Sequence, residues 1–398
     1  MLVVALCAIL PGADSWLGIQ VWGETKLDWL RRHIPLVHGI PSHDTFGRVF
    51  AALNSRQFEA CFIRWMSTLC PALAGQIVAI DGKTVRGSHQ RGERAIHLVS
   101  AYGSGLGAVL GQVRTADRSN GITAIPELPD ALLLRGAIVT IDAMGCQRNI
   151  ATRIPEAGAH YVLAVKGNLP TLLARMRTAL EAVDRFHDGY RKLATVSEHC
   201  EVEKGHGRIE TRRCLATDIL ADLQFEPEPW PGMRSIVMIG STREIGDNAA
   251  TGRRFVVSSL PPNATHIAPA VRAHWAIGNS SHWVLDMTFG EDQCRARIDN
   301  ASQNFAILRR IAMNLLRCDT RTKNSLKLRR LKAASCDRYR AQIIGWQGSW
   351  CFNNSCESPE RHCRYLQSIA CGWRPAIRQT VAISPLCSGY CSPRHELF

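Results

Sequence analysis

QIVAIDGKTVRGS, residues 76–88, contains a short apolar run that ends abruptly in a carboxylate. The run Ile77–Ile80 is rich in β-branched residues, and Gly82 follows directly after Asp81, which is typical of a short buried strand that ends in a turn. An aspartate at the end of a strand often serves only to cap a turn or a helix. Asp81 alone therefore does not indicate a functional site.

A second segment repeats this pattern 61 residues further along (142 − 81). In GAIVTIDAMGCQ, residues 136–147, the apolar run Ala137–Ile141 ends at Asp142. Two carboxylates at the ends of two buried strands suit Mg²⁺, which binds oxygen ligands and usually keeps several waters. Two such ions can stabilise the attacking and the leaving oxygen of a phosphoryl transfer. Asp81 and Asp142 are therefore candidate metal ligands and catalytic residues.

The composition favours a folded protein with a polyanionic partner. The chain has 398 residues, of which 46% are hydrophobic, so two or three domains are expected. Lys and Arg number 48 against 34 Asp and Glu, which gives a net charge of +14. Such an excess predicts DNA or RNA as a partner, with an ordinary solvated basic surface as the alternative.

Neither the N-terminus nor the cysteines indicate secretion. The opening MLVVALCAILPG is apolar but lacks a basic segment and a clear cleavage site, so we interpret it as a core helix whose earlier part is missing. The fifteen cysteines form no C-x-x-C pair, which disfavours a zinc ribbon. The sequence also contains no apolar run of membrane-spanning length. We expect a soluble cytoplasmic protein with free thiols and no membrane association.

The order of predicted elements indicates an α/β fold. Three strands come first, then a helix, a strand, a helix, a strand and a helix, over residues 76–84, 95–102, 108–114, 122–134, 137–141, 147–156, 161–165 and 172–183. This is the order of the ribonuclease H-like mixed sheet, in which the first and fourth strands are neighbours. The order therefore predicts that Asp81 and Asp142 lie close together.

Further segments flank or interrupt this sheet, which we place in residues 71–318. Residues 1–70 have apolar residues at helical spacing and predict a small helical domain, either a plain bundle or a DNA-binding unit. Ser42 or Asp44 would cap one of its helices. A β-rich insertion is expected at about 190–262, and a basic helical extension at 319–345. The Cys-rich tail, residues 346–398, shows no amphipathic period and is expected to be disordered.

The insertion contains a strongly charged segment, EKGHGRIETRR, residues 203–213. Its arginines, including Arg208 and Arg212, would contact phosphate or balance neighbouring glutamates. A metal cluster formed by His206 with Glu203 and Glu210 is an alternative interpretation of the same segment.

Several segments together resemble bacterial insertion-sequence DDE transposases of the H-repeat-associated subgroup. The matching segments are IPSHDTFGRVF (40–50), AIDGKTVRGS (79–88), AIHLVSAY (95–102), VTIDAMGCQ (139–147), YVLAVKGN (161–168), EKGHGRIETR (203–212), VRAHWAI (271–277), HWVLDMTFGEDQCR (282–295) and LRRIAMNLL (308–316). The resemblance implies a ribonuclease H-like core, Mg²⁺ or Mn²⁺, and cutting and joining of double-stranded DNA at terminal inverted repeats by a homodimer near the nucleoid.

The same resemblance assigns roles to individual residues. Asp81 and Asp142 match the first two catalytic acids, and Lys83, Lys166, Arg208 and Arg212 would position phosphates.

The third acid of the family, a glutamate three residues after a helical tryptophan, is replaced here by Gly278, three residues after Trp275. Glu291 or Asp292 is a possible substitute, although each lies more than three helical turns away. We therefore expect a transposase by descent that is weak or inactive as a catalyst. A DNA-binding protein that occupies element ends without cleaving them is the alternative, and a general ribonuclease H-like nuclease is a third possibility.

Overall fold

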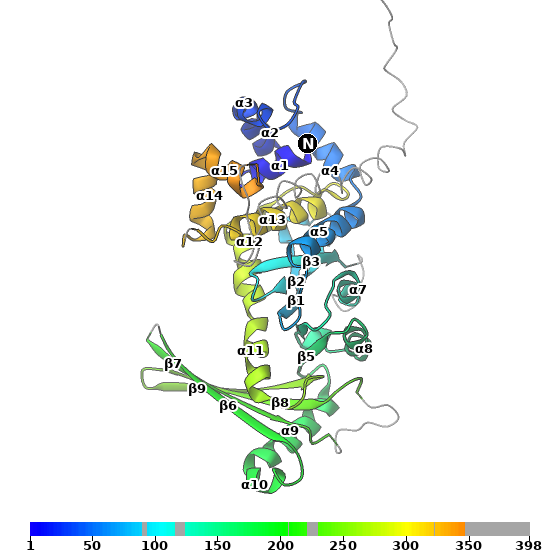
Figure 1. Ribbon diagram of the computed structural model, residues 1–398, viewed down its shortest axis with the longest axis vertical. Coiled ribbons are helices and arrows are strands. Elements are labelled where there is room, and N and C mark those ends of the chain that lie inside the picture. Colours follow the sequence, from blue (N-terminus) through cyan, green and yellow to red (C-terminus); the bar gives the residue numbers. More distant parts are fainter. Residues whose placement is uncertain (90–93, 116–123, 206, 221–229, 322, 347–398) are drawn as a thin grey trace, which may run out of the picture.

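The structure is a computed structural model, and it describes residues 1–89, 94–115, 124–205, 207–220, 230–321 and 323–346. Within these residues one nine-stranded sheet has the order β3-β2-β1-β4-β5-β9-β8-β7-β6. The N-terminal helices lie at one end of the molecule and strands β6–β9 at the other (Figure 1). The predicted α/β architecture with a mixed sheet is confirmed.

Strands β1 to β5 form the half of the sheet that positions the two aspartates. The strands β1, β2 and β3 form an antiparallel meander, and β4 runs parallel to both β1 and β5. The first and fourth strands are thus neighbours, as the order of elements predicted. All four residues of β4 are buried, which is expected for a strand with neighbours on both sides and helices on both faces. The strands are β1 (Ile77–Thr84), β2 (His97–Gly103), β3 (Ala108–Arg114), β4 (Ile138–Ile141) and β5 (His160–Val165).

The predicted β-rich insertion continues this sheet instead of forming a separate one. Strand β9 pairs antiparallel with β5, and β8, β7 and β6 follow in antiparallel order. The distal parts of β8 and β9 are exposed, so this end of the sheet projects beyond the core (Figure 1). The strands are β6 (Val196–Gly205), β7 (Arg208–Thr217), β8 (Ser235–Ile245) and β9 (Asn248–Ser258).

Helices between the strands cover the sheet. The helix predicted over 122–134 is observed only as the short α7, because Leu132 already has an extended backbone. Residues 122 and 123 lie outside the described residues. Figure 1 shows α7 and α8 on the opposite side of β1 and β5 from α11. The helices are α7 (Glu127–Ala131), α8 (Arg148–Glu156), α9 (Pro170–Arg185) and α10 (His187–Tyr190).

The N-terminal segment is helical and contributes to the core. Residues Val4–Leu10 are buried, so the apolar opening is a core helix as expected. Ser42, not Asp44, caps α4, because its hydroxyl accepts the Thr45 N–H at 3.3 Å. The helices are α1 (Leu2–Ile9), α2 (Trp16–Thr25), α3 (Leu27–Arg31), α4 (His43–Ala52) and α5 (Ser55–Leu69).

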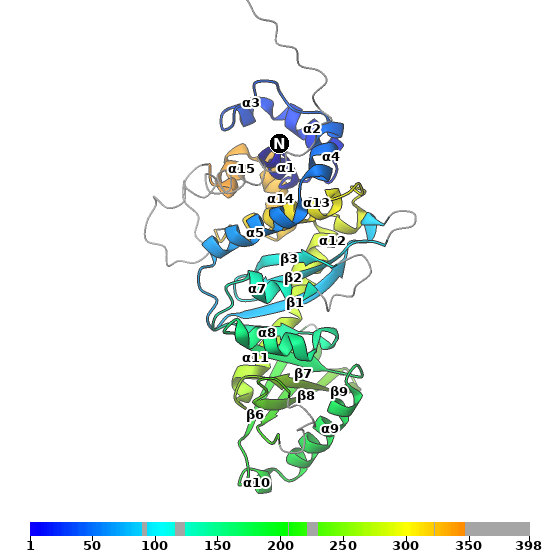
Figure 2. The same ribbon diagram turned by 90° about the vertical axis from the view of Figure 1, so that its right-hand side faces the viewer.

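The C-terminal helices connect both ends of the molecule. Helix α11 contacts β1, β4, β6 and β7, and α13 packs between the N-terminal helices and β3 (Figures 1 and 2). The single helix predicted over 271–289 contains a π-helical turn, η4, at the weak helix formers Gly278–Ser281. These elements are α11 (Ala264–His274), η4 (Ile277–His282), α12 (Trp283–Met287), η5 (Glu291–Gln293), α13 (Ala301–Arg317), α14 (Leu326–Ser335) and α15 (Asp337–Ile344).

The described chain ends in contact with the N-terminal helices. Trp346 stacks on His33 with ring centroids 4.2 Å apart, and it also lies 5.2 Å from the ring of Trp29. The rest of the predicted tail, 347–398, lies outside the described residues. Among the helices of the described ranges, none is both long enough and apolar enough to cross a membrane.

Candidate active site

Asp81 and Asp142 occupy equivalent places on two hydrogen-bonded parallel strands. Ile80 of β1 pairs with Ile141 of β4, and each aspartate is the next residue after this pair. Because parallel strands in register present equivalent positions at the same edge of the sheet, the two carboxylates lie on the same face. The structure thus brings together the two aspartates that the sequence singles out.

Backbone N–H groups orient both carboxylates. The Oδ1 atom of Asp81 accepts the N–H of Gly82 at 2.8 Å. The Oδ1 atom of Asp142 accepts the N–H groups of Met144 at 3.1 Å and Gly145 at 3.3 Å, so Asp142 caps the short helix η2 (Ala143–Gly145). The capping role of strand-end aspartates therefore applies to Asp142. These hydrogen bonds involve only the Oδ1 atom of each carboxylate.

The electrostatic environment of Asp81 disfavours its charged form. Burial raises the pKa of Asp81 to about 6. The hydrogen bond from the Gly82 N–H lowers this pKa, whereas the negative charge of Asp142 raises it. The Nδ1 atom of His282 lies 3.6 Å from Oδ2 of Asp81. Burial, together with the charges of Arg310 and Lys83, lowers the pKa of His282 to about 4. The imidazole is therefore neutral near pH 7 and does not balance the two carboxylates.

A cavity of about 630 Å³ joins this pair to the third position of interest. Its wall includes Asp81, Asp142, Lys166, Trp275 and Gly278. A Cβ atom added to Gly278 would meet nothing within 4 Å, so the cavity has room for a side chain there. The residue that replaces the expected third acid thus shares one cavity with the two aspartates.

The donor set fits one divalent cation. Mg²⁺ is commonly held by one or two carboxylates and several waters, which is what Asp81 and Asp142 can provide. In the part of the chain that the structure describes, no group of three or more His, Cys, Asp or Glu side chains is arranged to hold a metal ion. A site for two ions would need a further carboxylate, and Gly278 offers none.

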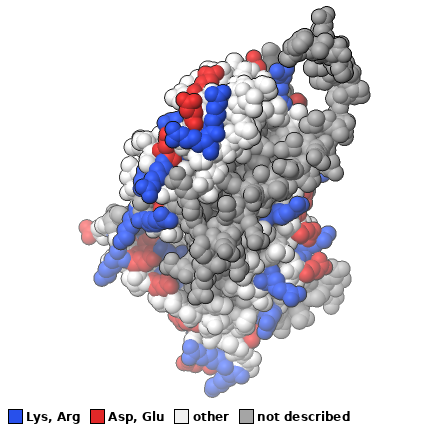
Figure 3. Space-filling model, turned by 45° about the horizontal axis from the view of Figure 1, so that its top comes forward, with Lys and Arg blue, Asp and Glu red and all other residues white. Residues whose placement is uncertain are grey.

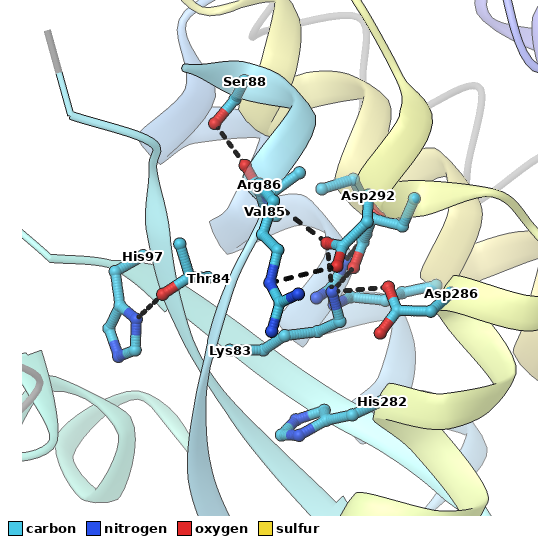
Figure 4. A network of polar contacts seen from close by, with 12 residues as sticks. Lys83, Thr84, Val85, Arg86, Ser88, His97, His282, Asp286 and Asp292 are labelled. Carbon is cyan, nitrogen blue, oxygen red and sulfur yellow. Dashed lines mark hydrogen bonds and ion pairs between the residues drawn. The ribbon is translucent and has the colours of Figure 1, made fainter.

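Lys83, predicted as a phosphate contact, points into the protein (Figure 4). Its Nζ atom lies 2.7 Å from Asp286, 3.0 Å from Asp292 and 3.4 Å from Glu291, and its side chain is only 7% exposed. This placement differs from the predicted one, because three carboxylates already surround the ammonium group. We call Lys83, Asp286, Glu291, Asp292 and Arg310 the Lys83 cluster.

Glu291, considered as a substitute acid, belongs to this cluster. Its side chain is fully buried, and its Oε1 atom accepts a hydrogen bond from Arg310 at 2.8 Å. Burial alone would raise the pKa of Glu291, but Arg310 and Lys83 outweigh it and the pKa is lowered. Glu291 is not among the described residues that line the cavity. Glu291 is therefore placed as an internal counter-ion.

The remaining predicted phosphate contacts differ in their surroundings. Lys166 is exposed and lines the cavity. Arg208 lies 3.0 Å from Glu210, and Arg212 pairs with both Glu203, at 2.8 Å, and Glu210. These pairs also occupy the two glutamates of the alternative metal cluster, whose histidine at position 206 lies outside the described residues. Figure 3 shows basic and acidic side chains interspersed on one face of the molecule.

The sequence does not indicate that His282 is a candidate site residue. The available signal was its place on the same helical stripe as Trp275, four residues after Gly278. The stripe did not show that this stretch packs beside Asp81, because that contact joins residues far apart in the chain.

The fold and site define an α/β protein with a carboxylate pair suited to a divalent cation. The chain belongs to the Transposase DDE domain family, whose model matches residues 73–315. A model described as DDE_Tnp_1-associated matches residues 1–66. The chain is thus a bacterial insertion-sequence DDE transposase of the H-repeat-associated subgroup, as its motifs predicted.

The names of two relatives agree with this assignment, and one solved structure is only weakly similar to the chain. The chain is 39% identical over 352 residues to "Putative transposase YncI" of Escherichia coli O157:H7, covering 86% of this chain and 88% of that protein. It is 36% identical over 366 residues to "H repeat-associated putative transposase YhhI" of Escherichia coli K12, covering 87% and 92%. Among solved structures, a piggyBac transposase synaptic complex with hairpin DNA has a TM-score of 0.33 and 11% identity, over 74% of this chain and 56% of that one.

Proposed function

We propose that this protein binds double-stranded DNA at the terminal inverted repeats of an insertion sequence and descends from an enzyme that cuts and joins these ends. We further propose that the catalytic domain is ribonuclease H-like and that Gly278 impairs catalysis. One observation supports this most strongly: Asp81, Asp142 and Gly278 line a single cavity, in a chain of the Transposase DDE domain family.

Asp81 and Asp142 would hold the cation, Mg²⁺ or Mn²⁺. When bound, such an ion supplies Lewis-acid stabilisation of charge on phosphate oxygens. The backbone N–H groups of residues 82, 144 and 145 keep the carboxylates in place for it. Lys166, exposed at the cavity, would attract a DNA phosphate towards the pair. Because burial raises the pKa of Asp81 to about 6, protons would compete with a cation for this carboxylate as the pH falls towards 6 and below.

The impairment follows from the missing carboxylate. Glycine offers no oxygen to a metal, so a second ion would be held loosely, and small errors in positioning cost orders of magnitude in rate. The same residue favours the second candidate function, a DNA-binding remnant that occupies element ends without cleaving them. In either case we propose a homodimer on DNA, which also contacts the target duplex, in the cytoplasm near the nucleoid.

A cleavage assay separates these two functions. Labelled duplexes that carry the ends of the element encoding this chain would be incubated with Mg²⁺ and either the unmodified protein or its Gly278→Glu variant. We expect specific binding by both proteins and clear cleavage by the variant only. Asp81→Asn in the Gly278→Glu background should abolish that cleavage. Binding without cleavage by all variants would favour the remnant, and cleavage of unrelated duplexes would favour a general nuclease.

A further inference from the structure

The Lys83 cluster joins the strand of the first aspartate to the segment that follows the third acidic position. Lys83 lies two residues after Asp81 on β1, so both side chains lie on the same face of the sheet. Its three carboxylate partners all lie after Gly278, namely Asp286 on α12 and Glu291 and Asp292 on η5. The ammonium group therefore links β1 to the chain that leaves η4.

Backbone contacts reinforce this link at η1 (Arg86–Ser88), the turn that follows β1. The N–H of Arg86 donates to Oδ1 of Asp292 at 3.2 Å. A Cβ atom at Gly87 would lie 2.4 Å from the carbonyl oxygen of Cys294, so the two backbones are in direct contact. The Nε atom of Arg297 donates to the Gly87 carbonyl at 2.9 Å. Together these contacts fix η5 to the end of β1.

The segment from η4 to η5 is also fixed on the side that faces α13. The guanidinium group of Arg310 on α13 is fully buried and donates to Glu291. Arg317, also on α13, donates to the carbonyl oxygen of Ser280 in η4. The π-helical turn that carries Gly278 is thus fixed between β1 and α13, although its own residues are weak helix formers.

We propose that Lys83 is a positioning residue that sets the place of position 278 relative to Asp81. Its positive charge draws the carboxylates of α12 and η5 towards β1, and so determines whether a side chain at 278 can reach the cation held by Asp81 and Asp142. This inference rests on the proposed function, because it assumes that position 278 faces the metal. It replaces a direct role of Lys83 in DNA binding.

A double-mutant cycle tests the inference through metal affinity. Mn²⁺ binding would be measured by isothermal titration calorimetry on four full-length proteins: the unmodified chain, Gly278→Glu, Lys83→Met, and the double variant. We expect Gly278→Glu to tighten binding roughly tenfold or more with Lys83 present, and by less than about threefold in the Lys83→Met background. The gain in each background is a ratio of two affinities, so an effect of the lost Lys83 charge that is common to both proteins cancels.

Two further variants make the cycle specific. Lys166→Met removes one positive charge that lines the cavity, and no described contact joins Lys166 to α12 or η5, so we expect the full gain from Gly278→Glu in that background. Asp286→Asn removes the helix side of the contact with little change in shape, and it should reduce the gain as Lys83→Met does. Because Asp286 is partly exposed, this variant also tests the contact should Lys83→Met fail to fold.

The measured Mn²⁺ affinities distinguish the positioning role of Lys83 from the metal-facing role of position 278. An undiminished gain in both the Lys83→Met and the Asp286→Asn backgrounds would overturn the positioning role and leave the proposed site intact. No gain from Gly278→Glu even with Lys83 present would overturn the metal-facing role of position 278, and the positioning role with it. DNA titrations complete the test, because Lys83→Met should leave the salt dependence of binding unchanged. If Lys83 contacted a DNA phosphate, Lys83→Met would instead reduce the magnitude of the slope of log affinity against log salt concentration by about one.

Discussion

Gly278 and Asp81 lie in the wall of one cavity, and a Cβ atom on Gly278 would meet no atom within 4 Å. The two residues come from different elements, the π-helical turn η4 and the strand β1. The space beside Gly278 means that a Cβ atom can be added there without displacing its neighbours. It also means that the glycine is not required by close packing at this point.

We therefore predict that Gly278→Glu restores strand cleavage with Mg²⁺. The new carboxylate can reach the cavity of Asp81 and Asp142, and better positioning of the reacting groups should raise the cleavage rate by roughly 100-fold or more. The fold should tolerate the change, because glycine inside a helix costs about 1 kcal/mol relative to alanine and most other residues are favoured over it. Single-turnover cleavage of labelled element ends measures the effect.

Gly278→Gln is the matched control for this prediction. Glutamine has nearly the same size and a similar helix propensity but no negative charge, so it should improve stability without restoring cleavage. Equal cleavage by the Gln and Glu variants would show that helix stability, not a carboxylate, limits the unmodified protein. Rapid cleavage by the unmodified chain would show that another acid already completes the site.

DNA affinity should depend strongly on salt and should survive the loss of a catalytic carboxylate. The net charge of +14 implies that binding releases counterions from DNA phosphates, so the affinity should fall steeply as salt concentration rises. Asp81→Asn removes no basic group and should leave the affinity unchanged or slightly higher. Fluorescence anisotropy at several salt concentrations gives both results. An affinity that barely changes between low and physiological salt would contradict an electrostatic interface.

Glu291→Gln should destabilise the protein rather than act on catalysis alone. The change would leave Arg310 fully buried without its counter-ion, and breaking a buried pair in this way typically costs about 3–5 kcal/mol. Urea denaturation measures the loss, and Asp292→Asn, at a side chain that is 26% exposed, should cost clearly less. If Glu291 instead served as the missing acid, cleavage would fall while the free energy of unfolding stayed the same.

Much of the sheet could be predicted from local sequence. The β-branched runs before Asp81 and Asp142 predicted where β1 and β4 lie. The strand β4 ends directly before Asp142, whereas β1 continues through Asp81 and Gly82 to Thr84, because these residues pair with β2. The order of elements was enough to place β1 beside β4. The order of elements did not indicate that the β-rich insertion continues the same sheet. The pairing of β5 with β9 joins segments that lie far apart in the chain.

The surroundings of individual charged residues were harder to predict. Lys83 and Asp292 are 209 residues apart, and nothing near Lys83 in the sequence shows that it faces carboxylates instead of solvent. For the same reason Glu291 resembled an available acid, although Arg310 neutralises it within the core. A motif records residue types and spacing, whereas burial and partners depend on packing between distant segments.

The last prediction concerns Glu59, a carboxyl buried between α5 and α13. Its Oε1 atom accepts hydrogen bonds from Gln303 at 2.7 Å and Gln112 at 3.5 Å, yet burial is the larger effect and raises the pKa of Glu59 to about 7. The folded protein therefore keeps this proton at pH values where the unfolded chain, with an ordinary pKa near 4.5, has lost it. The contribution of Glu59 to the free energy of unfolding is fully present below about pH 4.5 and is lost as the pH rises through about 7.

Glu59→Gln removes the titration, so at pH 8 the variant should be more stable than the unmodified protein by up to about 3 kcal/mol. At pH 4.5 the two should differ little, and urea denaturation across this range measures the difference. A stability difference that is the same at both pH values would show that Glu59 does not titrate in this window.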